Sequence, residues 1–265
     1  MSVAVTILGC GSSGGVPRVA QGWGACDPEN PLNRRRRCSI LVEQTGPEGV
    51  TRVLVDTSPD LREQLIEAKV THLDGILMTH GHADHTNGID DVRPLVLHMR
   101  RMLDIHMDEP TSSVVRRSFR YIFETPEGSQ YPPLLREHRI RPGKAFQIEG
   151  AGGELKAMPL RLDHGEIESL GFRFGNLAYT PDVKSIFPET YPHLEGLDLW
   201  IIDALRYTSH PTHFSLEEAL AMIKLFRPKR AVLTNLGSEV DYATLRAELP
   251  AHVEPAHDMM RIAIG

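Results

Sequence analysis

Three histidines and one aspartate crowd residues 80–85, which read His80-Gly81-His82-Ala83-Asp84-His85. Imidazole nitrogens and carboxylate oxygens bind zinc and harder divalent metals. The apolar run Ile76-Leu77-Met78 leads directly into this segment, and a turn after a strand can direct alternate side chains toward two neighbouring centres. His80 and His82 are therefore predicted to bind one ion, and Asp84 and His85 another. A histidine-rich surface loop without a ligand is less favoured, because four ligand-type side chains follow one apolar run.

Three further candidate residues end apolar runs elsewhere in the chain. Asp56 follows Leu54-Val55, His164 follows Leu162-Asp163, and Asp182 follows Tyr179-Thr180-Pro181. An isolated Asp or His at the end of a strand is more often a cap or turn residue than a ligand. Each of the three is therefore a weak candidate when taken alone.

Short runs rich in Val, Ile and Leu predict the strands that must position these side chains. They cover Val3–Leu8, Ser39–Glu43, Arg52–Val55, Gly75–Met78, Leu155–Leu160, Phe172–Tyr179, Leu199–Ile202, Ala231–Thr234 and Met260–Ile264. Helices are predicted to begin at Ser58-Pro59-Asp60 and at a capping box of Ser215 and Glu218, and to cover residues 111–123. In the first part of the chain the predicted strands follow one another, and later they alternate with helices. This order indicates layered sheets with helices outside.

Length and composition narrow the class of protein. With 265 residues, 41% of them hydrophobic, the chain suits one domain, and residues 125–143 are predicted to be a loop insertion. A net charge of −6 argues against binding of long nucleic acid. No apolar run approaches the ~20 residues of a membrane span, and three scattered cysteines argue against a disulfide framework. We expect a cytoplasmic protein without a membrane partner, and a homodimer stays open.

The histidine segment and the single residues together resemble the metallo-β-lactamase superfamily, whose signature is H-x-H-x-D-H after a strand. The resemblance covers nearly the whole chain and implies an α/β (α+β) fold, a four-layer αββα sandwich over residues 1–265. It implies two divalent ions, Zn or Mn, with the ligands His80, His82, Asp84, His85, His164 and Asp182. Asp56 would orient the metal loop rather than contact an ion directly.

Asn235, in Leu233-Thr234-Asn235, departs from the family pattern, which has a histidine there in two-metal members. A neutral amide oxygen binds metal far more weakly than an imidazole, so Asn235 would ligate weakly or through water. We therefore expect two sites of unequal affinity. The tighter site would use His80, His82 and His164, and the weaker one Asp84, His85 and Asp182.

The loop Gly9-Cys10-Gly11-Ser12-Ser13-Gly14 resembles the start of the PhnP-like cyclic phosphodiesterases. Val16-Pro17 would block the helix that a dinucleotide site needs, so no organic cofactor is expected. Further matches to that family are Gly22-Trp23-Gly24-Ala25-Cys26, Arg34–Arg37 and Gly88–Arg93. The resemblance implies a small phosphodiester or nucleotide as substrate.

Side chains for substrate binding and proton transfer are predicted outside the metal ligands. His213 matches a histidine that this family places beside the metals and uses in catalysis, and the N-terminus of the following helix favours a phosphate nearby. Arg34, Arg36 and Ser13 are candidate contacts to the substrate phosphate. His210 is expected to be an exposed loop residue.

These observations predict a metallohydrolase, specifically a phosphodiesterase for small cyclic phosphodiesters or nucleotides. A metal-bound hydroxide, held by Asp84 and Asp182, would attack phosphorus, and His213 would stabilise the phosphoryl oxygens or protonate the leaving group. Two alternatives stay open. One is a thioesterase or lactonase, because the same metals polarise a carbonyl, and the other is a metal-binding accessory protein without catalysis.

Overall fold

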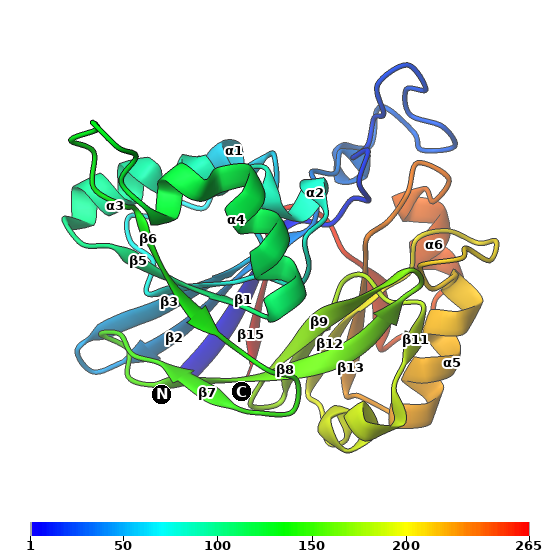
Figure 1. Ribbon diagram of the computed structural model, residues 1–265. Helices are drawn as coiled ribbons and strands as arrows, with labels where there is room; N and C mark the ends of the chain where they lie inside the picture. Colours follow the sequence, from blue (N-terminus) through cyan, green and yellow to red (C-terminus); the bar gives the residue numbers. More distant parts are fainter. Residues whose placement is uncertain (1, 265) are drawn as a thin grey trace.

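Two β-sheets packed face to face form the centre of the computed structural model, which describes residues 2–264 (Figure 1). The first sheet has the order β15-β1-β2-β3-β4-β5-β6. In chain order its strands are β1 Ser2–Gly9, β2 Ser39–Gly46, β3 Gly49–Val55, β4 Gly75–Leu77, β5 Leu103–Met107, β6 Leu135–Arg139 and β15 Met260–Ile264.

The second sheet has the order β11-β8-β9-β10-β12-β13-β14, and β7 pairs with β8 outside this path. Its strands are β7 Phe146–Ile148, β8 Leu155–His164, β9 Ile167–Phe174, β10 Leu177–Thr180, β11 Ser185–Ile186, β12 Leu199–Asp203, β13 Arg230–Thr234 and β14 Val253–Pro255.

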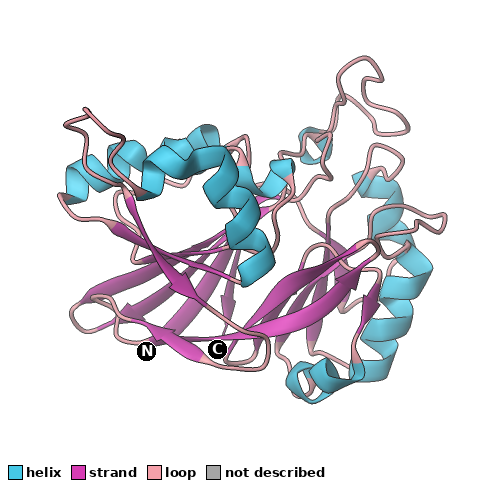
Figure 2. Cartoon of the chain, viewed as in Figure 1, coloured by secondary structure: helices cyan, strands magenta, loops and turns pink. Residues whose placement is uncertain are grey.

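Helices cover the outer face of each sheet (Figure 2). The first sheet carries α1 Leu61–Glu67, α2 Ala83–Thr86, α3 Arg93–Met99 and α4 Glu109–Phe123, and the second carries α5 Leu216–Phe226 and α6 Tyr242–Glu248. Short 3₁₀ helices lie at Pro31–Asn33, Ile89–Val92 and Pro188–Leu194. The layers confirm the predicted αββα sandwich. No described helix combines the length and the apolarity needed to cross a bilayer.

Alternating side chains in the strands explain the layering. On β3, Val53 and Val55 pack between the two sheets, whereas Leu54 packs under the helices of the first sheet. On β12, Ile201 faces the opposite sheet and Trp200 faces the helices of the second sheet. Because successive strand residues point to opposite faces, a continuous apolar run fills two cores at once.

Parallel pairing brings several strand ends to one edge. β3, β4, β5 and β6 pair in parallel in the first sheet, as do β10, β12, β13 and β14 in the second. The residues that follow such strands therefore lie near one another. This applies to Asp56 and the histidine segment on one side, and to Asp182 and Asn235 on the other.

Two local expectations are refined by the structure, and a third is confirmed. The predicted strand Phe172–Tyr179 is two strands, because Gly175, with φ of 57°, turns the chain between β9 and β10. The first helix begins at Leu61, and Ser58 Oγ accepts a hydrogen bond from the Asp60 backbone N–H instead of capping the helix. The capping box of Ser215 and Glu218 is confirmed.

The predicted loop insertion at residues 125–143 is a loop only in part, because Leu135–Arg139 forms β6 at the edge of the first sheet. This strand reads Leu-Arg-Glu-His-Arg and lacks the apolar pattern of a strand. It is held by polar contacts to α4, since Glu137 accepts a hydrogen bond from Ser112 Oγ at 2.6 Å and pairs with Arg116 at 2.5 Å. Arg139 lies 2.8 Å from the same carboxylate.

The Glu137 carboxylate is expected to stabilise the fold in a pH-dependent way. Burial raises its pKa, but Ser112 and Arg116 outweigh burial and hold the pKa below its ordinary value. Such a group stabilises the fold fully above its unfolded pKa, about 4.3, and the stabilisation is lost as the pH falls through the folded pKa. Glu137→Gln should lower the free energy of unfolding by about 1–3 kcal/mol at neutral pH and by less in acid.

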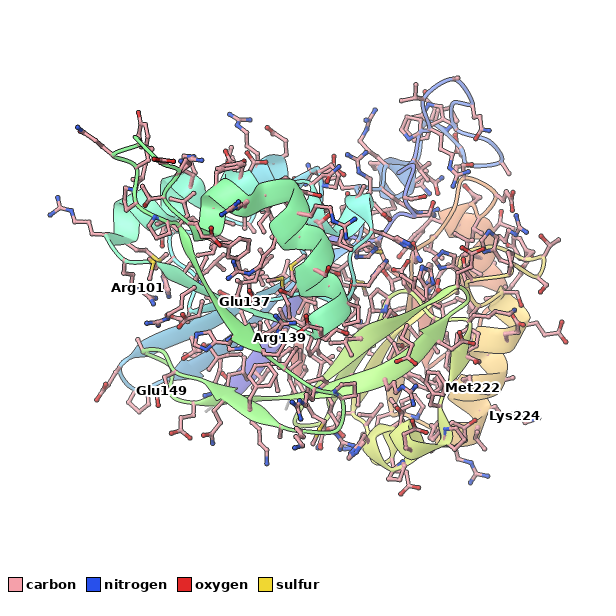
Figure 3. All side chains as sticks on the ribbon, in the orientation of Figure 1. Arg101, Glu137, Arg139, Glu149, Met222 and Lys224 are labelled. Atoms are coloured by element: carbon pink, nitrogen blue, oxygen red, sulfur yellow. The ribbon has the colours of Figure 1, made fainter. Side chains whose placement is uncertain are left out.

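Urea unfolding at neutral and acidic pH measures this difference. The matched control is Glu149→Gln, an exposed glutamate without an ion pair among residues 2–264, which should unfold like the wild type (Figure 3). A Glu137→Gln protein that is equally destabilised at both pH values would contradict the role of the charge.

Candidate metal centre

The histidine segment lies in the turn between β4 and α2. β4 ends at Leu77, and the chain continues through His80 to His82, whose extended backbone precedes the first residue of α2. His80 and His85 are each 1% exposed, whereas His82 is exposed. His80 Nε2 lies 2.9 Å from His82 Nδ1, so these two imidazoles direct nitrogen atoms at a shared point.

The side chain of Asp56, which follows β3, holds this turn through three contacts. Its buried carboxylate accepts hydrogen bonds from Thr79 N–H and Thr79 Oγ1, both at 2.8 Å, and lies 2.7 Å from His85 Nδ1. The bond to Nδ1 leaves His85 Nε2 free for a second partner. Asp56 thus connects to the turn through Thr79 and His85, which is the position that the resemblance implied for it. Thr79 is a positioning residue that the sequence patterns did not reveal.

Possible ligand atoms gather in three overlapping groups, within each of which they lie 4.8 Å apart or less. The groups are His80, His82 and His164; His80, His85 and Asp182; and His164, Asp182 and His213. The first is the triad expected for the tighter site. His164 is held from behind, because its Nδ1 lies 2.7 Å from the backbone oxygen of Thr212 and its Nε2 is therefore available to the group.

The chemistry of these side chains fits a divalent cation. Burial, reinforced by the neighbouring charge of His85, lowers the pKa of His80 well below its ordinary value, and burial lowers the pKa of His164. The downward shifts favour the neutral imidazole, which is the form that can bind a metal. Burial opposes ionisation of Asp182, but His85 outweighs it and holds the pKa of Asp182 well below its ordinary value. Asp182 Oδ1 is buried and has no well-directed hydrogen bond, so this oxygen is available to bind an ion.

Asp84 and Asn235 lie at the margin of the groups. Asp84 Oδ2 is 3.4 Å from His85 Nε2, and Asp182 Oδ1 is 3.1 Å from the same nitrogen, so these three side chains converge as expected for a second site. Asn235, at φ of 60°, directs its Nδ2 at the Pro181 oxygen, 3.1 Å away, and at His213 Nδ1, 3.0 Å away. Weak ligation by Asn235 stays a prediction.

His213 is paired with a carboxylate that the sequence patterns did not single out. Asp203, at the end of β12, is fully buried and lies 2.9 Å from His213 Nδ1. Burial raises the pKa of Asp203 to about 7. Burial lowers the pKa of His213, but Asp203 outweighs it, and the net shift is upward. The sequence could have indicated Asp203, because it ends the run Trp200-Ile201-Ile202-Asp203, which has the same form as Leu54-Val55-Asp56.

His210 is not the exposed loop residue that we expected. It is partly buried, and its ring centre lies 5.1 Å from that of His213. Its Nδ1 accepts a hydrogen bond from the Thr212 backbone N–H at 3.3 Å. The loop therefore packs His210 beside His213, a member of the third group.

The predicted phosphate contacts lie apart from these groups. Arg36 pairs with Glu67 at 2.6 Å, and the Arg34 guanidinium lies 5.4 Å from the centre of the Trp23 ring. Both arginines line a cavity of about 560 Å³ whose walls include no member of the metal groups. Ser13 is exposed in the glycine-rich loop. The geometry thus gives these three residues no contact with the clustered ligands.

Comparisons with known proteins agree with this fold. The family model described as Beta-lactamase superfamily domain matches residues 51–234. The crystal structure of a diphosphatase from the PhnP family is 33% identical, with a TM-score of 0.89 over 100% of this chain and 98% of that chain. Zinc-bound PqqB from Methylobacterium extorquens shares the fold at 18% identity, with a TM-score of 0.75 over 98% of this chain and 100% of that chain.

A longer curated relative carries a different name. A protein of Porphyromonas gingivalis called octanoyltransferase is 32% identical over 262 residues, which are 97% of this chain. The chain spans about half, 51%, of the length of that relative. The name therefore describes a protein with as much sequence outside the match as within it.

Divalent ions are expected to stabilise the protein through the first group. An ion that binds only the folded state adds about 2.7 kcal/mol at a free concentration 100-fold above its Kd, so Zn²⁺ or Mn²⁺ should raise Tm. His164→Ala should lose most of this rise, because one of three clustered nitrogens is removed. Differential scanning fluorimetry with and without the metal measures the effect. His98→Ala, in an exposed histidine outside the groups, should keep the full rise; an equal rise in all three proteins would contradict the site.

Proposed function

The chain belongs to the β-lactamase superfamily, and from this premise we propose that it is a metal-dependent phosphodiesterase acting on small substrates. The observation that carries the proposal is the convergence of His80, His82, His164 and Asp182 next to His213, which is itself paired with Asp203. A set of neutral nitrogens and one ionised carboxylate suits a divalent ion, and a neighbouring imidazole suits proton transfer.

We propose that His80, His82 and His164 hold the tighter ion and that His85, Asp182 and Asp84 hold the weaker one. Zn or Mn held there would supply Lewis acidity, which activates water and neutralises charge on the phosphoryl oxygens. The protein's own contribution is to fix the ligands in advance. His85 is oriented by Asp56 and His164 by the Thr212 carbonyl, so little reorganisation is needed on binding.

His213 is the proposed general acid. As water adds to phosphorus and the bond from phosphorus to the leaving oxygen breaks, a proton at Nε2 of His213 would pass to the departing alkoxide, and the proton that the water loses would pass to solvent. The Nδ1 contact to Asp203 keeps the ring oriented and favours the protonated form that can donate. Asp203 acts through His213 and is therefore a positioning residue.

The comparisons favour phosphorus over carbon as the reacting centre. The PhnP-family neighbour, 33% identical over the full chain, is described as a diphosphatase. The relative named octanoyltransferase supports a second candidate, hydrolysis of an acyl thioester, because the same ligand set can polarise a carbonyl. That name belongs to a protein of twice the length, so its support for this candidate is weaker.

Turnover of bis(p-nitrophenyl) phosphate tests the proposal. His82→Ala and Asp182→Ala should abolish turnover and lower bound metal. His213→Ala should lower kcat by about 10²–10⁴ while bound metal is retained. A His213→Ala protein with full activity would exclude the acid role, and loss of metal in it would make His213 a ligand, as the third group allows. Octanoyl thioester turnover without diester turnover would favour the second candidate.

Metal counting tests the unequal sites. Elemental analysis after mild chelation should find the ions leaving in two stages, because Asn235 supplies no strong ligand to the weaker site. Asn235→His should bring the two stages together by adding an imidazole. Joint loss of both ions from the wild type would refute two sites of different affinity.

A further inference from the structure

The loop that carries Asp182 after β10 is held by three side chains from other segments of the second sheet. Ser169 Oγ, on β9, donates to the Asp182 backbone oxygen at 2.6 Å. Asn235 Nδ2, after β13, donates to the backbone oxygen of the preceding residue at 3.1 Å. Asp203 Oδ2, at the end of β12, accepts from the backbone N–H of the following residue at 3.1 Å. The backbone on both sides of Asp182 is therefore fixed by hydrogen bonds to side chains.

Ser169 differs from the other two side chains because it does not contact His213. Asp203 Oδ2 lies 2.9 Å and Asn235 Nδ2 lies 3.0 Å from His213 Nδ1. Ser169 is 1% exposed, and its hydroxyl makes no other hydrogen bond within residues 2–264. No step of the phosphodiester chemistry described above uses it. The contact from Ser169 can therefore be removed while the partners of His213 stay in place.

The residue after Ser169 contacts the other ligand loop. The Leu170 backbone N–H donates to the Thr79 oxygen at 2.8 Å, and Thr79 directly precedes His80. This bond joins the two sheets, because β9 belongs to the second and Thr79 follows β4 of the first. β10 pairs with β9 at Phe172–Phe174, so Leu170 has no partner from β10 and reaches across to the metal loop.

The same hairpin carries a candidate ligand of its own. β8 ends at His164, which pairs with Ile167 at the start of β9, and Ser169 pairs with Leu162. One β-hairpin thus supplies His164 and also hydrogen-bonds the two loops that carry the remaining candidate ligands. Because a paired hairpin is more rigid than a loop, β9 sets the separation of the two loops.

The contact from Ser169 affects the ligand groups unequally. Asp182 is a member of two of the three groups but not of the group formed by His80, His82 and His164. Its Oδ1 lies 3.1 Å from His85 Nε2, among the ligands proposed for the weaker ion. A shift of the Asp182 backbone would move this oxygen and leave the nitrogens of the first group where they are.

We propose that Ser169 is a positioning residue for the weaker ion, which acts through the backbone of Asp182. This inference rests on the two ion sites of the proposed function and goes beyond them, because it assigns control of one affinity to a side chain outside the ligand set. Loss of the hydroxyl would leave a buried backbone oxygen without its donor and release the ligand loop. Hydrogen bonds that orient metal ligands typically change metal affinity by about 10–100-fold when they are removed.

Metal titration of Ser169→Ala tests the proposal. Competition with a chelator, using Zn²⁺ and Mn²⁺ in turn, should find the weaker ion bound about 10–100-fold less tightly than in the wild type. The Kd of the tighter ion should stay within about twofold of the wild-type value, because its three nitrogens do not depend on Asp182. An unchanged weaker ion, or equal weakening of both ions, would overturn the assignment.

Two conservative variants connect the effect to the hydroxyl. Ser169→Thr keeps the O–H donor and should restore most of the affinity for the weaker ion. Ser169→Cys has a similar shape but a weaker donor, so its Kd should fall between those of the wild type and Ser169→Ala. The two variants decide the question even if Ser169→Ala fails to fold. A Kd for Ser169→Cys equal to that of Ser169→Thr would contradict a role of the hydroxyl as donor.

The matched control is Ser112→Ala, which removes a similar hydroxyl far from the metal groups. Ser112 is also 1% exposed, and its Oγ donates at 2.6 Å to Glu137. Both Ala variants should unfold at lower urea concentration than the wild type in the absence of metal, but Ser112→Ala should bind both ions normally. An equal loss of metal affinity in Ser112→Ala would refute positioning, because the loss would then follow from lower stability alone.

Binding measured without turnover separates this inference from the proposed function. A wild type that binds two ions but hydrolyses no diester would refute the phosphodiesterase, and the Ser169→Ala titration would still decide the positioning role. Hydrolysis of bis(p-nitrophenyl) phosphate by the wild type, together with normal binding of both ions by Ser169→Ala, would refute the positioning role alone. A wild type that binds fewer than two ions would overturn this inference and the two-site proposal together.

Discussion

The buried carboxylate of Asp56 is the interaction on which the metal centre depends. An unpaired carboxylate in a protein interior costs several kcal/mol, so Asp56 must be surrounded by donors. Thr79 provides two and His85 a third, and all come from the turn after β4. Satisfying one buried charge therefore fixes the conformation of the whole ligand loop. The same contact sets which nitrogen of His85 faces Asp182.

The second half of the centre comes from the opposite sheet. His164 ends β8, Asp182 follows β10 and Asp203 ends β12, so these side chains are as rigid as the strands that carry them. Between the sheets, residues such as Val55, Phe172 and Ile201 form one apolar core. Because protein interiors are close-packed, this core fixes the distance between the two sets of candidate ligands. Packing of the two sheets thus fixes the relative positions of the side chains that they carry, as Asp56 fixes the conformation of one loop.

The sequence predicted those features that depend on neighbouring residues in the chain, and missed those that depend on contacts between distant segments. The histidine segment and most strands were predictable, since four ligand-type side chains lie within six residues and the strands are continuous apolar runs. β6 was missed because Glu137 and its partners on α4 hold it, and polar contacts between distant segments leave no periodic pattern. Asp203 follows three apolar residues, a local pattern that marks it as a candidate. Its role depends on His213, which lies in a separate loop and contacts it. Unequal metal sites, the catalytic acid and the phosphate contacts stay predictions.

The arginine run from Arg34 to Arg37 shows why the local density of charge is a poor guide to an anion site. Arg35 is 2% exposed and donates to the Gly237 oxygen at 3.1 Å and to Asn33 Oδ1 at 3.1 Å, which ties the amino-terminal loop to the segment after β13. Arg36 and Arg37 pair with Glu67 and Asp60. Neighbouring guanidinium groups repel one another, and carboxylates neutralise two of the four within residues 2–264, Arg36 and Arg37. Arg18 and Arg206 stand apart in the sequence and line one small cavity, where hydrogen bonds to neutral oxygens position them.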